Sequence, residues 1–230
     1  MLNSLLRRIT GRSYTIDRQD LAYLMQKGAR PMLRGALWRI LRRQRPNGLM
    51  LGRGIEFVLS SRLSLGRGVS IGSYSYLDCS ASEGVVLGNR VTIREHAWLQ
   101  CRSGLNEPAT GIVIGAGSYI GPNAVIGAGG LIEIGRNVQI GARFTVSAES
   151  HVAGADGTYT SGRVSRQGVR IGDDCWFGNN VSVLDGVTIG QGAVVGAGSV
   201  VTRSLPARSI AYGVPAKVVR IQDERQPASP

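Results

Sequence analysis

A repeat of six residues runs through most of the chain and limits the folds open to it more than any other feature. From Leu51 onward, an aliphatic residue followed by a small one, usually glycine, recurs at this spacing. The longest uninterrupted run leads its hexads with Ile171, Phe177, Val183, Ile189, Val195 and Val201. Shorter blocks begin at Leu65, Ile71 and Leu77; at Leu87, Ile93 and Leu99; at Ile114, Ile120 and Ile126; and at Ile134, Ile140 and Val146. A fixed internal period of this kind is typical of a solenoid, in which one small unit is stacked many times.

Six residues suffice for one short extended segment and one corner, so three hexads predict a three-sided coil with its aliphatic residues pointing inward. Stacked coils would pair their backbones at the ordinary strand spacing of about 4.8 Å. The chain has 33 glycines and only 6% aromatic residues, which fits tight corners and a core of small and β-branched side chains. The 3.6-residue period of an α-helix is missing here, so we expect an all-β, parallel β-helix.

The phase of the repeat slips between the blocks, and the excess residues must loop out of the column. Ten residues separate Leu77 from Leu87, and fifteen separate Leu99 from Ile114. The largest slip, between Val146 and Ile171, leaves an inserted loop over residues 147–170 that holds one of the two histidines. Insertions in repeat proteins cluster where binding occurs, so this loop is the first candidate for a functional site.

The first 48 residues form a basic, partly helical segment. They hold eleven Arg or Lys against Asp17 and Asp20, within a net charge of +12 for the whole chain. Residues 17–45 have a helical pattern in which Leu33, Leu37, Ile40 and Leu41 share one face. Two interpretations stay open: residues 30–45 make peripheral contact with a membrane surface, or the helix caps the open end of the solenoid.

Other features of the sequence narrow the class of protein. The three cysteines, Cys79, Cys101 and Cys175, are widely spaced with no CxxC pair, so we expect a reduced setting and no metal site. No stretch approaches the roughly 18 apolar residues of a spanning helix, and the N-terminus lacks the apolar run of a signal peptide. No helix-turn-helix, RNA-binding or zinc-finger signature is present, so nucleic acid is not an expected partner. We expect a cytoplasmic protein, with association with the inner face of the membrane left open.

Three motifs between His151 and Arg220 carry a family resemblance. They are a histidine about twenty residues before IGDDCW, the tryptophan of that hexad, and the terminal GVPAKVVR. With the repeat, they resemble the hexapeptide-repeat superfamily, in its galactoside, maltose and xenobiotic O-acetyltransferase branch. The block AGGLIEIGRNVQIGARFTVSAESH is more narrowly similar to bacterial enzymes that decorate capsule, exopolysaccharide or O-antigen sugars.

The resemblance covers about residues 50–220 and implies more than periodicity does. It implies a left-handed β-helix, although parallel crossovers are otherwise right-handed. It also implies a homotrimer with active sites between subunits, acetyl-CoA as co-substrate, and transfer of acetyl to a saccharide hydroxyl, lipid-linked or not. We expect a basic segment over residues 1–48, a catalytic β-helix over 49–206 that contains the inserted loop, and a C-terminal segment and tail over 207–230.

His151 is the candidate catalytic base. An alcohol is a poor nucleophile until its proton is being removed, and an imidazole is largely neutral at pH 7 yet easily protonated. The resemblance assigns the same role to the histidine at this position. Glu149, two residues earlier, is a candidate to orient the ring or stabilise the imidazolium, and a solvated loop acid is the alternative.

The resemblance places the donor, coenzyme A, along a groove between neighbouring subunits near the C-terminal coils. Trp176 would flank this groove and Asn179 would lie near the thioester and pantetheine. The backbone of the three small residues after Val195 would approach the pantetheine arm, and cations further on would bind its phosphates. The candidate cofactor-binding residues are Trp176, Asn179, Gly196, Ala197, Gly198, Thr202, Arg203, Lys217 and Arg220.

Acceptor binding is less well marked in the sequence. Asn123, Tyr159 and Gln167 are candidates, chosen from a phase break and from the long loop. Two alternatives to saccharide acetylation remain: an acetyltransferase of a small molecule such as an antibiotic or serine, and a non-catalytic β-helix scaffold. A γ-type carbonic anhydrase would need three histidines around one metal, whereas this chain has two histidines in total.

Overall fold

The computed structural model describes residues 17–104, 107–155, 157–159 and 163–223. The chain divides into two compact units, residues 1–50 and 51–230. The outer parts of the predicted terminal segments, residues 1–16 and 224–230, lie outside the described residues.

The N-terminal unit is a helix interrupted by one wider turn. It consists of α2 (Arg18–Leu24), the π-helix η1 (Met25–Ala29) and α3 (Arg30–Leu41). Asp17 caps the start, because its Oδ1 accepts from the N–H of Asp20 at 2.7 Å while the Asp20 carboxylate accepts from the N–H of Asp17. The helix predicted over residues 17–45 ends at Leu41, and Arg43 adopts a left-handed conformation with φ 57°. No described helix is both long and apolar enough to cross a membrane.

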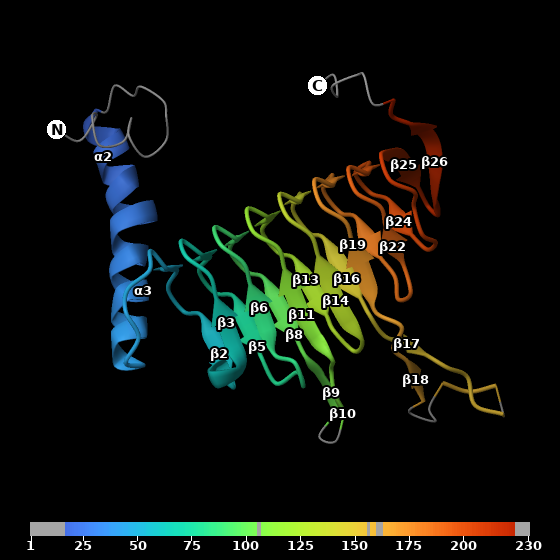
Figure 1. Ribbon diagram of the computed structural model, residues 1–230, viewed down its shortest axis with the longest axis horizontal. Coiled ribbons are helices and arrows are strands. Elements are labelled where there is room, and N and C mark those ends of the chain that lie inside the picture. The colour runs from blue at the N-terminus through green and yellow to red at the C-terminus, as the bar shows by residue number, and fades with distance from the viewer. Residues whose placement is uncertain (1–16, 105–106, 156, 160–162, 224–230) are drawn as a thin grey trace. The chain divides into compact units, whose positions relative to one another are not determined.

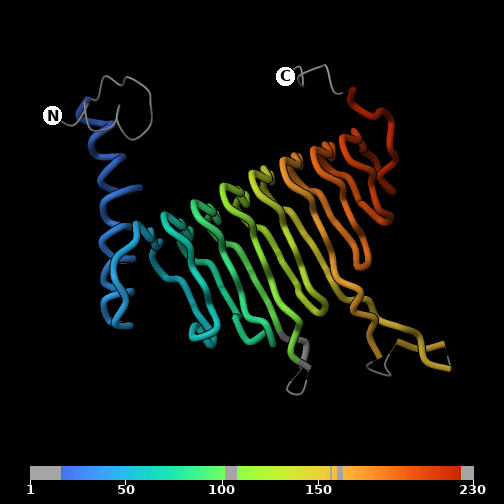
Figure 2. Tube along the Cα trace, in the orientation of Figure 1, coloured from blue at the N-terminus to red at the C-terminus, as the bar shows by residue number. Residues whose placement is uncertain are grey.

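The second unit is a parallel β-helix, as the repeat predicts, and it has the left hand that the family resemblance implies. Three sheets form its sides, and consecutive strands visit the sheets in turn (Figures 1 and 2). The nine-stranded sheet consists of β1 (Met50–Leu51), β4 (Ser70–Ile71), β7 (Thr92–Ile93), β12 (Tyr119–Ile120), β15 (Gln139–Ile140), β20 (Trp176–Phe177), β23 (Val194–Val195), β25 (Ser209–Gly213) and β26 (Ala216–Ile221). The seven-stranded sheet consists of β2 (Glu56–Val58), β5 (Tyr76–Asp78), β8 (Trp98–Gln100), β13 (Val125–Gly127), β16 (Thr145–Ser147), β21 (Ser182–Val183) and β24 (Val200–Val201). The six-stranded sheet consists of β3 (Leu63–Leu65), β6 (Val85–Leu87), β11 (Gly111–Ile114), β14 (Leu131–Ile134), β19 (Val169–Ile171) and β22 (Thr188–Ile189), and a 3-10 turn, η2 (Ser60–Arg62), precedes β3.

The inward residues of the repeat form the core of the column. Every aliphatic or aromatic residue that leads a hexad in the predicted blocks is at most 3% exposed, except Leu65 near the start of the column. Phe144 packs edge-on against Phe177 at a ring-centroid distance of 5.5 Å, and both rings are buried inside the column. The continuous apolar column explains why two-residue strands are stable here, since each strand is buried on one side and hydrogen-bonded to coils above and below.

The three largest phase slips leave the column at the same edge. The extra residues lie between β5 and β6, between β8 and β11, and between β16 and β19, and each of these steps runs from the seven-stranded to the six-stranded sheet. The second excursion forms the hairpin β9 (Arg102–Gly104) and β10 (Glu107–Pro108), and the third forms β17 (Ser150–His151) and β18 (Val164–Ser165). Figure 1 shows both hairpins projecting on one side of the column. We call this edge the insertion edge.

Candidate active site

A shallow groove lies on the outer face of the nine-stranded sheet. Its volume is about 280 Å³. It is lined by Tyr119, Gln139, Ile140, Gly141, Trp176, Phe177, Gly178, Asn179 and Ala197. The structure thus brings together three of the residues predicted to bind the donor, Trp176, Asn179 and Ala197, and half of the Trp176 side chain remains exposed.

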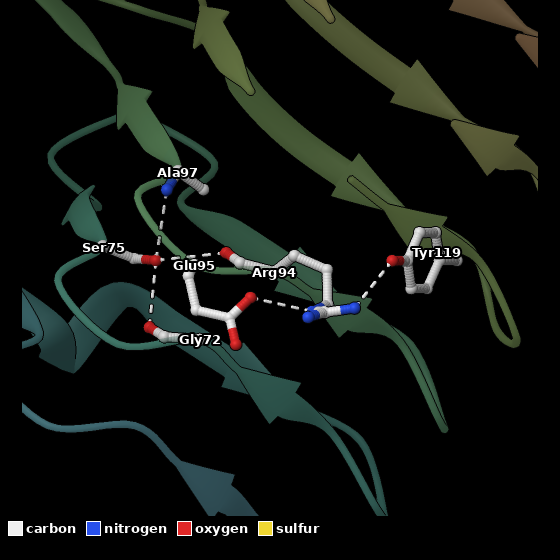
Figure 3. A network of polar contacts seen from close by, with 6 residues as sticks. All are labelled: Gly72, Ser75, Arg94, Glu95, Ala97 and Tyr119. Atoms are coloured by element: carbon white, nitrogen blue, oxygen red, sulfur yellow. Dashed lines mark hydrogen bonds and ion pairs between the residues drawn. The ribbon is translucent and has the colours of Figure 1, made fainter. Parts of the chain in front are cut away.

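Six of the nine lining residues are absent from the predicted set, and Tyr119 and Gln139 are the two with polar side chains. Strand register places them in one row with Trp176, because Tyr119 is opposite Gln139 and Gln139 is opposite Trp176. Each directly precedes the inward residue of its hexad, so the outward position of the repeat is a sequence signal that could have found them. Figure 3 shows the Tyr119 hydroxyl accepting a hydrogen bond from the Arg94 guanidinium at 3.0 Å, while Arg94 also pairs with Glu95 at 2.8 Å.

The same row continues past Trp176 to the C-terminal strands. Trp176 is opposite Val194, Val194 is opposite Ile210, and Ile210 is opposite Arg220. Three strand spacings therefore separate Arg220 from Trp176, or about 14 Å.

A β-bulge in the final hairpin puts Lys217 and Arg220 on one face. Residues three apart on a regular strand point to opposite faces, but here the register shifts between Ile210 and Ala211. Lys217 is opposite Tyr212 and Arg220 is opposite Ile210, and these two partners are two residues apart on β25. Since directly opposed residues share a face, both cations lie on the outer face of the nine-stranded sheet. Both are exposed.

The glycines beside the groove have distinct local causes. A Cβ at Gly196 would lie 2.8 Å from the Tyr212 Cβ, so glycine lets the last hairpin pack closely. Gly198 has φ +72° and open space where a side chain would stand. The buried Ser199 hydroxyl links these glycines to the hairpin of β25 and β26. It donates to the Gly196 carbonyl and accepts from the Gly213 N–H.

Thr202 and Arg203 lie elsewhere. They are exposed and directly follow β24 of the seven-stranded sheet, on the way to Leu205, which bridges to Ile189 of the six-stranded sheet. This position is at the insertion edge of the last coil. Within one chain, the predicted phosphate-binding cations are therefore divided between the groove face and the insertion edge.

His151 projects from the hairpin on the insertion edge. It is exposed and its backbone pairs with Val164 across β17 and β18. The Glu149 carboxylate forms an ion pair with Arg166 at 2.9 Å, and both side chains are mostly buried. This contact ties the two legs of the excursion together at its base.

Close packing at the base fixes where the hairpin leaves the column. A Cβ at Gly129 would lie 2.7 Å from both Cβ and Oε2 of Glu149. The segment that carries Glu149 can therefore pass this close only because residue 129 is a glycine. On the other leg, the Asp185 carboxylate accepts hydrogen bonds from the N–H groups of Gln167 and Gly168, at 3.2 and 2.8 Å. The AGG sequence before Leu131 is thus part of the hairpin's support.

The three candidate acceptor residues do not form one cluster in a single chain. Asn123 is an exposed corner residue between β12 and β13 with φ 58°, a conformation that asparagine tolerates. Tyr159 is 64% exposed in the excursion, and Gln167 lies at its base.

Asn179, a candidate for donor binding, also has a structural contact, since its Oδ1 accepts from the Ala142 N–H at 2.8 Å.

Topology separates the histidine from the groove. In a three-sided coil, the face formed by one sheet lies opposite the edge where the other two sheets meet. The groove lies on the nine-stranded sheet, and the hairpin of His151 leaves from the edge between the other two. A single chain therefore does not bring the candidate base to the candidate donor groove.

Cys175 lies next to Trp176 but has the properties of a core residue. It is 1% exposed, and its Sγ donates to the Gly190 carbonyl at 3.2 Å. Burial raises the pKa of its thiol to about 11, so on the order of one molecule in ten thousand carries the thiolate at pH 7. Among the described residues, no group of three or more His, Cys, Asp or Glu side chains is placed to hold a metal ion.

We therefore expect Cys175→Ala to retain turnover within about twofold while costing about 1 kcal/mol of stability, since a small buried side chain is shortened. Thiol release from the acyl donor and thermal unfolding measure the two effects. A folded variant that had lost more than a hundredfold in turnover would instead indicate an acyl-cysteine intermediate.

Comparisons with known proteins bear on the same coils. A family model described as "Bacterial transferase hexapeptide (six repeats)" matches residues 168–203. A protein of Staphylococcus aureus (strain MRSA252) named "Putative acetyltransferase SAR2635" is 55% identical over 60 residues, which make up 26% of this chain and 30% of that protein. The galactoside O-acetyltransferase of Escherichia coli (strain K12) is 44% identical over 57 residues, 25% of this chain and 28% of that protein. The chain thus spans less than a third of the length of these curated relatives.

One solved structure extends the likeness over most of the chain. A maltose O-acetyltransferase from Clostridium difficile 630 aligns with a TM-score of 0.51 and 26% identity, covering 72% of this chain and 73% of that one. The resemblance to hexapeptide-repeat O-acetyltransferases is confirmed by these comparisons.

Proposed function

Because this chain is a hexapeptide-repeat protein similar to O-acetyltransferases, we propose that it transfers acetyl from acetyl-CoA to a saccharide hydroxyl, in the synthesis of a bacterial surface polysaccharide. One observation supports this most directly. The groove lined by Trp176, Asn179 and Ala197 continues along one strand row toward two exposed cations.

The donor fits this row by its chemistry. Coenzyme A combines an uncharged pantetheine arm with a pyrophosphate and a 3′-phosphate. The arm would lie in the groove against Trp176, with the Asn179 amide as a hydrogen-bonding group. The phosphates would lie toward Lys217 and Arg220, where charge-assisted hydrogen bonds to phosphate oxygens are available.

The insertion edge of a second copy would complete the site. Since His151 and the groove lie on opposite sides of one chain, a neighbouring subunit must supply the base, and with it Arg203 and the acceptor-binding part of the loop. Head-to-tail contacts form a closed ring when the rotation between copies closes, and the ring proposed here is the homotrimer that the family resemblance implies, with three sites.

The reaction then proceeds by direct attack. His151 accepts the proton of the saccharide hydroxyl as its oxygen bonds to the thioester carbonyl carbon. When the tetrahedral intermediate collapses, the carbon–sulfur bond breaks and the imidazolium returns the proton to the departing thiolate. The products are an acetyl ester and free coenzyme A, and no covalent enzyme intermediate is required. Glu149 is assigned as a positioning residue for the histidine loop through its ion pair with Arg166.

The saccharide acceptor is proposed from the relatives' names, galactoside and maltose O-acetyltransferase. Tyr159, Gln167 and Asn123 are the candidate acceptor contacts. Cytoplasmic location and peripheral membrane contact through residues 30–45 belong to the same proposal, because a surface-polysaccharide precursor can be lipid-linked.

The direct test is acetyl-dependent thiol release from acetyl-CoA with a panel of galactosides, maltose and polysaccharide fragments, and with serine and aminoglycosides as small-molecule arms. We expect turnover with a saccharide, and about a thirtyfold rise in the KM for acetyl-CoA when Lys217 and Arg220 are both changed to Gln, since each phosphate contact contributes roughly 1 kcal/mol. If only a small molecule supported turnover, the acceptor class would be small molecules and not saccharides. Absence of acetyl-CoA binding in a folded assembly would instead support the scaffold alternative.

A further inference from the structure

The apolar stripe of α3 is turned away from the segment on which the helix packs. Leu33, Leu37, Ile40 and Leu41 recur at the spacing of one helix face, and their side chains are 56–73% exposed. Gly35 lies on the opposite side of the helix and is buried. A Cβ there would overlap the Leu49 carbonyl oxygen, so the returning residues 43–49 pack on the glycine side.

Polar contacts hold the packing side in place. The Arg39 guanidinium donates to the Arg45 carbonyl at 2.7 Å, and the Arg42 guanidinium lies over the Trp38 ring at 3.8 Å. A helix of a globular domain normally buries its apolar face and exposes its charges. In this unit the apolar face is exposed along with most of the charged side chains, so the exposed aliphatic residues need another explanation.

Charge identifies the partner. Residues 18–45 contain eight Arg or Lys and a single acid, Asp20. Arg30 and Arg34 border the apolar stripe, and Arg43 and Arg45 follow the helix end. A second copy of so basic a segment would be repelled, and a nucleic acid would match the charge but leave the aliphatic stripe unused. An anionic lipid bilayer offers both a negative surface and an apolar interior.

We propose that α3 lies in the plane of an anionic lipid bilayer, with its four exposed aliphatic side chains at the acyl-chain boundary. The flanking arginines would extend their apolar stems along the same boundary and place their guanidinium groups at lipid phosphates. Three arginines within α3 itself favour this surface position. This inference deepens the membrane contact included in the proposed function. Its evidence comes from the N-terminal unit alone, so vesicle binding can succeed or fail independently of the proposed transfer reaction.

The test is co-sedimentation of the full chain with vesicles of phosphatidylcholine mixed with phosphatidylglycerol, compared with phosphatidylcholine alone. We expect binding to the anionic vesicles that weakens with added salt. The pair Arg30→Gln and Arg45→Gln should weaken it about 25-fold, about fivefold for each charge near an anionic surface. The pair Leu37→Ser and Leu41→Ser should weaken it about tenfold or more, since apolar burial is lost.

Matched changes in the β-helix serve as controls. Arg67→Gln with Arg90→Gln removes the same charge from exposed sites, and Val86→Ser with Val125→Ser removes exposed aliphatic groups. Both should bind vesicles within about twofold of the unchanged protein. Equal binding to neutral vesicles, no binding to anionic ones, or serine variants that change only the mass of the assembly would each overturn the proposal.

Discussion

His151→Asn should lower turnover by about 10²- to 10⁴-fold, the usual contribution of a general base, while leaving acetyl-CoA affinity within about threefold. Asparagine retains hydrogen-bonding capacity but accepts no proton at neutral pH, and His151 lies on an exposed hairpin rather than in the core. The fold should therefore persist. The measurements are thiol release at saturating donor and acceptor, and donor affinity by calorimetry.

His96→Asn is the matched control, because it makes the same substitution in the only other histidine. His96 occupies a corner with φ 60°, a conformation that asparagine tolerates, and its ring stacks on Tyr74 at 5.5 Å. We expect turnover within about threefold of the unchanged protein. If His151→Asn behaved like this control, the base would have to be sought in another residue.

The column could be predicted from the sequence because its cause is local. Each hexad carries its own inward residue and corner, so the period alone gives the three-sided coil, and the three largest phase slips locate the excursions. The left hand could not be derived, because general rules for parallel crossovers favour the right, and only the family resemblance supplied it.

The groove was predictable only in part, because lateral neighbours depend on register across insertions. Tyr119 and Trp176 are 57 positions apart, yet they lie in one row, two strands from each other. The sequence also groups Arg203 with Lys217 and Arg220. The structure puts Arg203 at the insertion edge, and a β-bulge that no propensity marks puts the other two on the groove face.

Two inactive variants should restore activity to each other if the site is shared between copies. One is His151→Asn, which has an intact groove. The other is Ala197→Trp, whose large side chain would fill the groove where Ala197 lines it. In randomly mixed rings, a site works when its histidine comes from a groove-blocked chain and its groove from a histidine-deficient chain, so co-expression should recover about a quarter of normal activity.

A second mixture separates this arrangement from a site contained in one chain. When a chain carrying both changes is co-expressed with the unchanged protein, a shared site again requires two unchanged neighbours and gives about a quarter of normal activity, whereas a site within one chain gives about half. The two mixtures should therefore recover the same fraction of normal activity if His151 acts at the groove of the neighbouring subunit. An inactive first mixture beside a half-active second one, with equal assembly masses, would mean that the hairpin of His151 reaches the groove of its own chain, against the separation that the three-sided column imposes.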